Sequence, residues 1–224
     1  MIPLVLATIF FVGIHFVISG SRLRDTLVAR LGESRFRAGF SLLSIFGLWW
    51  LAHAYRAAPY IETWGQLGWF KPAALLLMLP AFLFATLGTT PANPTAVGGA
   101  APTAQTARGI LRITRHPFLW GVALWAATHL IANGDAASLV LFGSLLLLAV
   151  GGTYAIDDKR LRMYGEDWEK YSLATSNLPF LAIIQKRNTL VPGEIGGWRP
   201  ALALVLYLAM LHFHKGLFGV SPLF

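Results

Sequence analysis

Six histidines are the residues of this sequence best suited to chemistry, because most of them lie within or beside long apolar segments. They are His15, His53, His116, His129, His212 and His214. An ionisable side chain is costly inside a bilayer and usually marks a functional site there. Neutral imidazoles from two helices could hold a haem iron from both faces, or could bind another transition metal. The chain has no cysteine, which excludes thiolate ligands, disulfides and a cysteine nucleophile.

The depth of each histidine limits which of them can pair. At about 1.5 Å of rise per helical residue, His129 lies about 18 Å from the basic end of its segment, and His53 and His212 lie about 20 Å from theirs. His15 lies only about 8 Å from that end by the same measure. Depth alone therefore favours His129 with His53 or His212. Carboxylates are nearly absent from the apolar segments, so haem suits these ligands better than a harder metal ion.

A basic motif, Arg112-Ile-Thr-Arg115-His116-Pro117, precedes one apolar segment. Pro117 suits the first position of a helix, and the residue before a proline is kept out of helical geometry. The free N–H groups of that helix start carry positive partial charge, to which Arg112 and Arg115 add. The motif therefore predicts an anion site for a haem propionate, a nucleotide-like carboxylate or a lipid phosphate.

Two neighbouring acids, Asp157 and Asp158, end a later apolar segment. Paired carboxylates can serve acid–base catalysis. Because Lys159 and Arg160 are adjacent and Lys170 follows, we expect surface ion pairs here instead.

The elements that must position these side chains are membrane-spanning helices. Hydrophobic residues make up 56% of the chain and charged residues 12%, with a mean hydropathy of +0.60, whereas soluble domains average about 25% charged residues. A span needs about 20 mostly apolar residues, and six segments qualify: 2–20, 38–58, 69–90, 117–133, 136–156 and 199–217. We predict one all-α transmembrane domain over residues 1–224. The turn Asn133-Gly134-Asp135 should join the fourth and fifth spans in a tight hairpin.

The basic residues set the predicted orientation. One side of the six-span arrangement holds most of them: Arg22, Arg24, Arg30, Arg35, Arg37, Arg108, Arg112, Arg115, Lys159, Arg160, Arg162, Lys170, Lys186 and Arg187. The positive-inside rule makes that side cytoplasmic and places both termini outside. The net charge of +8 then reflects contact with anionic lipid rather than nucleic acid. We expect a multi-pass membrane protein.

Two of the predicted cytoplasmic segments have a character of their own. Residues 88–109 are rich in glycine, proline, alanine and threonine, which is typical of an ordered loop. Residues 158–173 place Leu161, Tyr164, Trp168 and Tyr171 on one helical face. This pattern predicts an amphipathic helix lying in the membrane interface.

Several stretches along nearly the whole chain resemble the NnrU family of bacterial membrane proteins. They include Gly13-Ile-His15, Ser19-Gly-Ser-Arg22-Leu-Arg24, Arg37-Ala-Gly-Phe-Ser41, Ala54-Tyr-Arg-Ala-Ala-Pro59, Asn93-Pro-Thr-Ala-Val-Gly98, Thr114-Arg-His-Pro-Phe-Leu-Trp120, His129-Leu-Ile-Ala-Asn-Gly-Asp135, Glu194-Ile-Gly-Gly-Trp198 and Phe218-Gly-Val-Ser-Pro222. The resemblance implies a location in the bacterial inner membrane and an association with denitrification, near nitrite and nitric oxide reduction. A nitrogen-oxide reductase system is the partner that this association suggests.

The family is also similar to the plant cis-zeta-carotene isomerase, which isomerises a carotenoid double bond with histidine-held haem b. Matched by motif, its histidines correspond to His15, His116 and His129, and the resemblance makes His15 and His129 the axial-ligand candidates. A hydrophobic isoprenoid-type substrate is implied as well. The isomerase uses a cysteine in a ligand exchange, and this chain has none. The predicted depths of His15 and His129 also differ by about 10 Å.

Two alternatives remain open. Residues 107–175 resemble the isoprenylcysteine and phospholipid methyltransferases, which implies an S-adenosylmethionine site with Arg115 and His116 on the cofactor carboxylate and Glu166 and Tyr171 around the rest. The other alternative is a non-catalytic assembly factor that holds a reductase subunit.

Overall fold

The computed structural model describes residues 1–89, 92–96, 98–103 and 106–223, and these ranges contain helices and no strand. The longer helices are α1 (Ile2–Gly13) with its π-helical continuation η1 (Ile14–Ser19), α2 (Arg22–Leu31), α3 (Glu33–Arg56), α4 (Lys71–Gly88), α5 (Pro117–Asn133), α6 (Ala136–Tyr164), α7 (Glu166–Ala174) and α9 (Trp198–Phe218). Short helical turns are η2 (Gly68–Phe70), η4 (Gly109–Arg112), α8 (Leu181–Ile184) and η5 (Pro192–Glu194). The all-α prediction is therefore confirmed for the described residues.

Five of these helices are long and apolar enough to cross a membrane: Ile2–Ser19, Glu33–Arg56, Gly68–Gly88, Ala136–Tyr164 and Trp198–Phe218. The remaining predicted span, the fourth, coincides with α5, whose 17 residues lie at the lower limit of spanning length. Residue 90, the predicted end of the third span, lies outside the described residues. The chain is thus a polytopic membrane protein.

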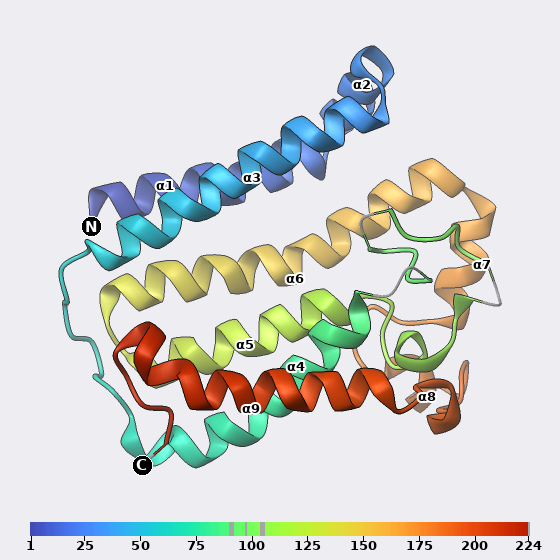
Figure 1. The fold of residues 1–224 in the computed structure, drawn as a ribbon. Coiled ribbons are helices and arrows are strands. Elements are labelled where there is room, and N and C mark those ends of the chain that lie inside the picture. The colour runs from blue at the N-terminus through green and yellow to red at the C-terminus, as the bar shows by residue number, and fades with distance from the viewer. Residues whose placement is uncertain (90–91, 97, 104–105, 224) are drawn as a thin grey trace.

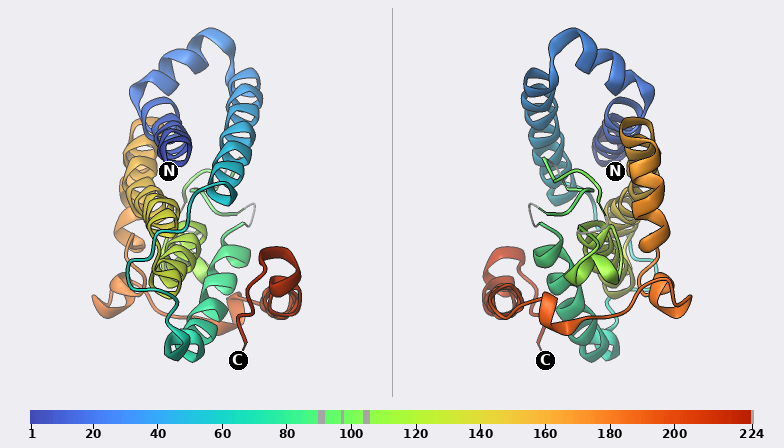
Figure 2. Two further views of the ribbon diagram at one scale, coloured as in Figure 1. Left: turned by 90° about the vertical axis from the view of Figure 1, so that its left-hand side faces the viewer. Right: turned by 90° about the vertical axis from the view of Figure 1, so that its right-hand side faces the viewer.

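The long helices pack in the spatial order α3, α1, α6, α5, α4, α9. Figures 1 and 2 show this order as a curved layer, with both chain termini at one end and α2, α7 and α8 at the other. An even number of spans requires the termini to share a side. That this side faces outward stays a prediction from the charge pattern.

The first core cluster joins the N-terminal helices to α6. Leu4, Ala7 and Phe11 of α1 pack with Leu51 and Ala54 of α3 and with Ala137 of α6. Tyr55 of α3 and Ser138 of α6 share a hydrogen bond of 2.9 Å at the same level. This cluster lies at the end of the bundle where both chain termini are found. In the opposite half of α3, towards α2, Phe36 is the one buried residue.

The predicted helical hairpin between α5 and α6 is confirmed. Gly134 ends α5 in the left-handed conformation with φ 60°, which glycine adopts without steric cost. The Asp135 carboxylate accepts a hydrogen bond of 2.9 Å from the Ser138 N–H and so caps α6. Pro117 opens α5 and His116 precedes it in a non-helical conformation, as the motif predicts.

Helices α4 and α5 approach each other closely because glycine occupies their contact. A Cβ atom at Gly121 would lie 2.7 Å from the Ala85 backbone nitrogen and 2.8 Å from the Ala81 carbonyl oxygen. One at Gly88 would lie 2.4 Å from the Phe118 nitrogen. Small residues commonly allow such contact between membrane helices.

We predict that Gly121→Ala destabilises the protein by about 1–3 kcal/mol, because the added methyl group meets backbone that cannot rotate away. Thermal unfolding in one detergent measures the effect. Gly143→Ala in α6 is the matched control, since its Cβ would meet only the Leu130 side chain at 4.0 Å. Equal melting temperatures for the two variants would contradict the close-contact explanation.

The predicted amphipathic helix over 158–173 is wrong in its extent. Residues up to Tyr164 continue α6, and Gly165, at φ 53° and ψ −124°, separates α6 from α7. The four residues expected on one face therefore belong to two helices. Trp168 and Tyr171 are buried, whereas Leu161 is 42% exposed. The apolar period of the sequence continues through Gly165, but the helix itself is interrupted there.

Candidate functional site

His129 lies among aromatic rings near the C-terminal end of α5. Its Nδ1 lies 2.9 Å from the Trp125 carbonyl oxygen one turn earlier, so Nδ1–H is the donor and Nε2 keeps a free lone pair. The ring packs against Trp125 and Phe142, with centroids 5.2 and 5.1 Å away. His214 of α9 lies beside it, with ring centroids 6.5 Å apart. A carbonyl-held Nδ1–H with a free Nε2 is the usual arrangement of a metal-ligating histidine.

His214 is a neighbour of His129 that the sequence did not indicate. It lies near the end of α9. Its Nδ1 lies 2.7 Å from the Val220 carbonyl oxygen, which again leaves Nε2 without a bond. The only sequence signal is the spacing His212-Phe-His214, which places the two imidazoles on opposite sides of α9.

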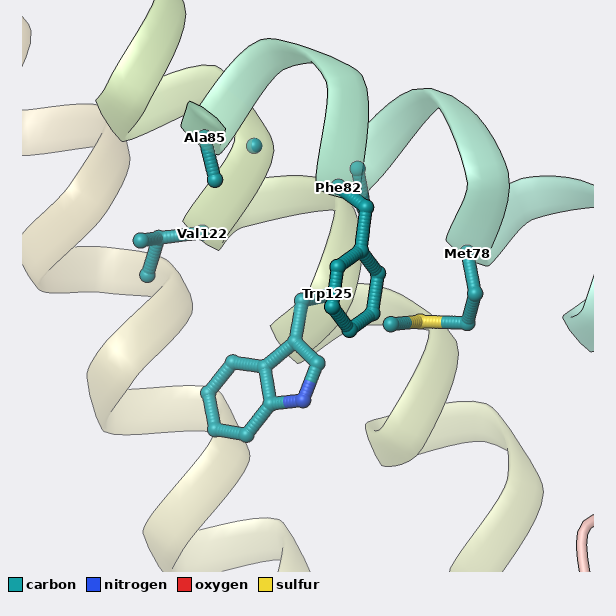
Figure 3. A pocket seen from close by; sticks show the side chains of 7 residues that line it. Met78, Phe82, Ala85, Val122 and Trp125 are labelled. Carbon is teal, nitrogen blue, oxygen red and sulfur yellow. The ribbon is translucent and has the colours of Figure 1, made fainter. Parts of the chain in front are cut away.

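An apolar groove of about 140 Å³ lies between α4 and α5, and Trp125, which packs against His129, is one of its lining residues. Figure 3 shows the side chains that line it: Met78, Phe82 and Ala85 of α4 with Val122 and Trp125 of α5. Phe82 also contacts Tyr207 of α9, at a centroid distance of 5.8 Å. Trp125 lines the groove and also packs against the His129 ring. Because the two residues are four positions apart on α5, the groove reaches to within one helical turn of that imidazole.

His15 occupies a different neighbourhood, at the start of the π-helical turn η1. Its Nδ1 lies 2.7 Å from the Phe11 carbonyl oxygen, and its ring packs against Phe11 and Phe40 at 4.6 and 5.3 Å. Single π-helical turns often occur at functional sites. The structure thus gives His15 the same free Nε2 as His129, but brings it into contact with α3 rather than α5.

The remaining apolar-segment histidines are exposed. His53 stacks on Trp49 of its own helix, with centroids 5.6 Å apart, and His212 contacts Phe213. Neither is brought to His129, although depth alone favoured both. The reason is rotational: depth sets the level of a side chain along a helix, whereas packing decides which face of the helix meets a neighbour.

A buried ionic cluster forms where α5 begins, around Asp157 of α6. Arg115 binds both carboxylate oxygens, through Nε at 2.9 Å and Nη2 at 2.5 Å. The His116 Nε2 lies 2.7 Å from Oδ1, and the Asn177 amide nitrogen lies 3.3 Å from Oδ2. His116 is only 1% exposed. Burial lowers the pKa of His116, although its bond to Asp157 acts in the opposite direction, so the imidazole is neutral at pH 7.

The expectation of surface ion pairs at Asp157 is wrong, because its partners come from a segment 41 and 42 residues away. The expectation is confirmed for Lys170, which forms a surface ion pair with Glu166 at 3.4 Å. The guanidinium of Arg115, expected to face a bound anion, is bonded to a protein carboxylate instead. No signal in the sequence connects Asp157 to the Arg115-His116 motif.

Arg112 has an acidic partner as well. Its Nε and Nη2 lie 2.7 and 2.8 Å from the two carboxylate oxygens of Glu194 in η5, and the Gly109 N–H also donates to Glu194, at 2.8 Å. The Arg112 hydrogen bonds, and then that from Gly109, hold the pKa of Glu194 at about 2, below its ordinary value of 4.5. The pair ties η5 to η4.

This pair predicts a pH dependence. Because the folded-state pKa of Glu194 is lowered, the stabilisation that its ionised carboxylate gives the folded state is complete above about pH 4.5. It is lost as the pH falls towards 2. We expect amide exchange of the segment 186–197, corrected for intrinsic rates, to rise across that window. Glu194→Gln should remove the dependence, whereas Glu166→Gln, at an exposed pair, should leave it. An unchanged profile in Glu194→Gln would contradict the assignment.

Comparison with known proteins gives one family and two relatives. The family model described as "NnrU protein" matches residues 3–222. The chain is 30% identical over 115 residues to the chloroplastic 15-cis-zeta-carotene isomerase of Arabidopsis thaliana, covering 51% of this chain and 30% of the relative. It is 35% identical over 82 residues to that of Zea mays, covering 37% and 22%. The matches thus span less than a third of either relative. No solved structure matches.

Proposed function

This chain belongs to the NnrU family, and from that membership we propose that it is a haem-b-binding, isomerase-like protein of the bacterial inner membrane that acts on an apolar, isoprenoid-type chain. The observation that carries the proposal is the His129 imidazole, which has a free Nε2, an aromatic surround and an apolar groove one turn away. The relatives named as zeta-carotene isomerases supply the substrate class.

The available ligands fit haem b by their chemistry. His129, His15 and His214 each have Nδ1 directed to a carbonyl oxygen, so each can offer a neutral Nε2. A six-coordinate haem iron takes two such nitrogens about 4 Å apart, if each bond is about 2 Å long. Proximity favours His214 as the partner of His129, and the family resemblance favours His15. A cysteine-free chain supports bis-imidazole ligation in either case.

Bound haem would supply a redox-active iron, which can lower the barrier to rotation about a conjugated double bond. The protein's own part is to bind, orient and exclude water. Trp125 and Phe142 hold the His129 ring from two sides. The groove between α4 and α5 presents apolar side chains to a hydrocarbon chain, and its end at Trp125 would place that chain beside the imidazole.

The experiment that tests the proposal is the absorption spectrum of the purified protein, expressed with ample haem supply. A Soret band is expected, shifting on reduction with dithionite. A colourless preparation that also fails to take up haem in detergent would overturn it.

The link to denitrification is part of the proposal and has its own test. We propose that the protein works beside a nitrogen-oxide reductase, as a redox component or as an assembly factor. Co-purification from mild detergent should then recover a reductase subunit from denitrifying cells. Recovery of the chain alone, under conditions that keep other membrane complexes intact, would count against a stable partner. No observation specifically supports an S-adenosylmethionine site. The Arg115 guanidinium, which would bind the cofactor carboxylate, is already paired with Asp157.

A further inference from the structure

His214 differs from His15 and His129 in the origin of the carbonyl group that holds its ring. His15 and His129 each bond through Nδ1 to a carbonyl oxygen four residues earlier in the same helical segment, because helical side chains lean towards the N-terminus. The Nδ1 of His214 lies instead 2.7 Å from the carbonyl oxygen of Val220, beyond the end of α9. The orientation of this imidazole therefore depends on how the chain continues after the helix.

The chain turns back over the last turn of α9 because Gly219 adopts the left-handed conformation. Its φ is 78°, and its N–H donates to the Lys215 carbonyl at 2.9 Å. This is the αL helix cap, in which glycine avoids the steric cost that a Cβ atom incurs at positive φ. The carbonyl group of the next residue, Val220, thereby reaches the His214 ring.

The other end of the tail, defined as residues 219–223, is tied to α4. The ammonium of Lys71, the first residue of α4, donates to the Leu223 carbonyl at 3.1 Å. Within the tail the Leu223 N–H donates to the Ser221 hydroxyl at 3.2 Å. Figure 1 shows the tail running from the end of α9 to the start of α4. The Val220 carbonyl thus lies in a segment that is held at both ends.

This carbonyl fixes one tautomer of His214. A carbonyl oxygen only accepts, so the proton of the neutral ring is on Nδ1 and the lone pair is on Nε2. The ring is half-buried, packs against Phe218 with centroids 4.9 Å apart, and lies 6.5 Å from the His129 ring at an interplanar angle of 25°. A backbone carbonyl on the far nitrogen is the usual means of orienting a metal-ligating imidazole.

We propose that the tail is a positioning element for His214, and that its Val220 carbonyl makes this imidazole the second nitrogen ligand beside His129. The inference rests on the proposed function, in which two neutral imidazoles hold haem b. Lys71 and Val220 are positioning residues, because they supply no ligand atom and act through His214. His15 does not depend on the tail, since its carbonyl partner lies one turn earlier in its own helix.

Gly219→Val tests the tail, because a β-branched side chain is strained at φ 78° and displaces the carbonyl that follows. Haem affinity, measured by titration of the haem-free protein, should fall about 10–100-fold, as on loss of an outer partner of a metal ligand. Free imidazole should restore the wild-type spectrum by supplying the missing nitrogen. A merely destabilised protein would show no such rescue. Unchanged affinity in Gly219→Val would overturn the proposal.

Gly216→Val is the matched control, because the two glycines differ in backbone conformation and not in free space. A Cβ atom at either position meets no heavy atom within 4 Å, but only Gly219 has a positive φ. Lys71→Met is a second test that adds no strain to α9 and remains decisive if Gly219→Val folds poorly. It should lower haem affinity in the same direction, and a value equal to wild type would contradict the anchoring role of the tail.

The tautomer of His214 can be measured without haem. In ¹⁵N-histidine-labelled protein in nanodiscs, the His214 signals, assigned by their absence in His214→Ala, should show a protonated Nδ1 and an unprotonated Nε2. Gly216→Val should keep this pattern, and Gly219→Val should give a mixture of tautomers. A wild-type ring with its proton on Nε2, or with both tautomers, would overturn the proposal.

Failure of this inference can be distinguished from failure of the proposed function. A wild-type protein that takes up no haem overturns both. A wild-type protein with a full Soret band, whose haem affinity is unchanged in Gly219→Val and Lys71→Met, overturns only the positioning role of the tail. That result would assign the second ligand to His15.

Discussion

Replacing Asp157 with asparagine is expected to lower the free energy of unfolding by about 3 kcal/mol, near the lower end of the range for a broken buried ion pair. The substitution keeps the shape of the side chain but removes its charge. Arg115, 13% exposed at its side chain, is then left as an uncompensated charge. Asparagine has one accepting oxygen, and its NH₂ group, itself a donor, faces the donors of either His116 or Asn177. The loss is therefore larger than that of one surface salt bridge.

Unfolding by heat or by denaturing detergent, monitored by circular dichroism, measures this effect. Asp158→Asn is the matched control, because the adjacent carboxylate is exposed and forms no ion pair among the described residues; its change should stay within about 0.5 kcal/mol. Adding Arg115→Met to Asp157→Asn should recover part of the loss, since it removes the unpaired charge. Equal stabilities for the two asparagine variants would show that the cluster contributes little.

Replacing His129 with alanine is expected to abolish haem binding, which is the largest effect on the proposed function. His129 combines the free Nε2 with the aromatic surround and with a helical position one turn from the groove, so its removal takes away one of the two nitrogens that would hold the iron. The Soret band should disappear, while the helix content by circular dichroism stays the same. Retention of the full band in His129→Ala would remove this imidazole from the ligand set and with it the geometric basis of the proposal.

Two further variants identify the second ligand. His214→Ala should change or remove the band if proximity decides the pair, and His15→Ala should do so if the family resemblance decides it. His212→Ala is the control, because this exposed imidazole lies on the same helix as His214 but points elsewhere. A spectrum lost equally in all four variants would indicate general destabilisation rather than ligation.

The sequence alone was sufficient for features that depend on a residue and its near neighbours. Apolar runs of about 20 residues predicted the long helices, because a membrane-spanning backbone must satisfy its hydrogen bonds internally. Pro117 predicted the start of α5, and Asn133-Gly134-Asp135 predicted the hairpin, since left-handed glycine and an acidic cap act within a few residues. The family motifs are also local, and the family model matches nearly the whole chain.

The tertiary structure alone decided which distant side chains meet. Asp157 of α6 pairs with Arg115 and His116, which precede α5, and His214 of α9 comes to His129 of α5. No periodicity shows either contact, because it depends on the rotation of each helix about its axis and on the close approach that glycine allows between α4 and α5. Local sequence determines what a residue can donate, accept or ligate; packing determines which partner it reaches, and here packing turned a basic motif into a neutralised, buried cluster.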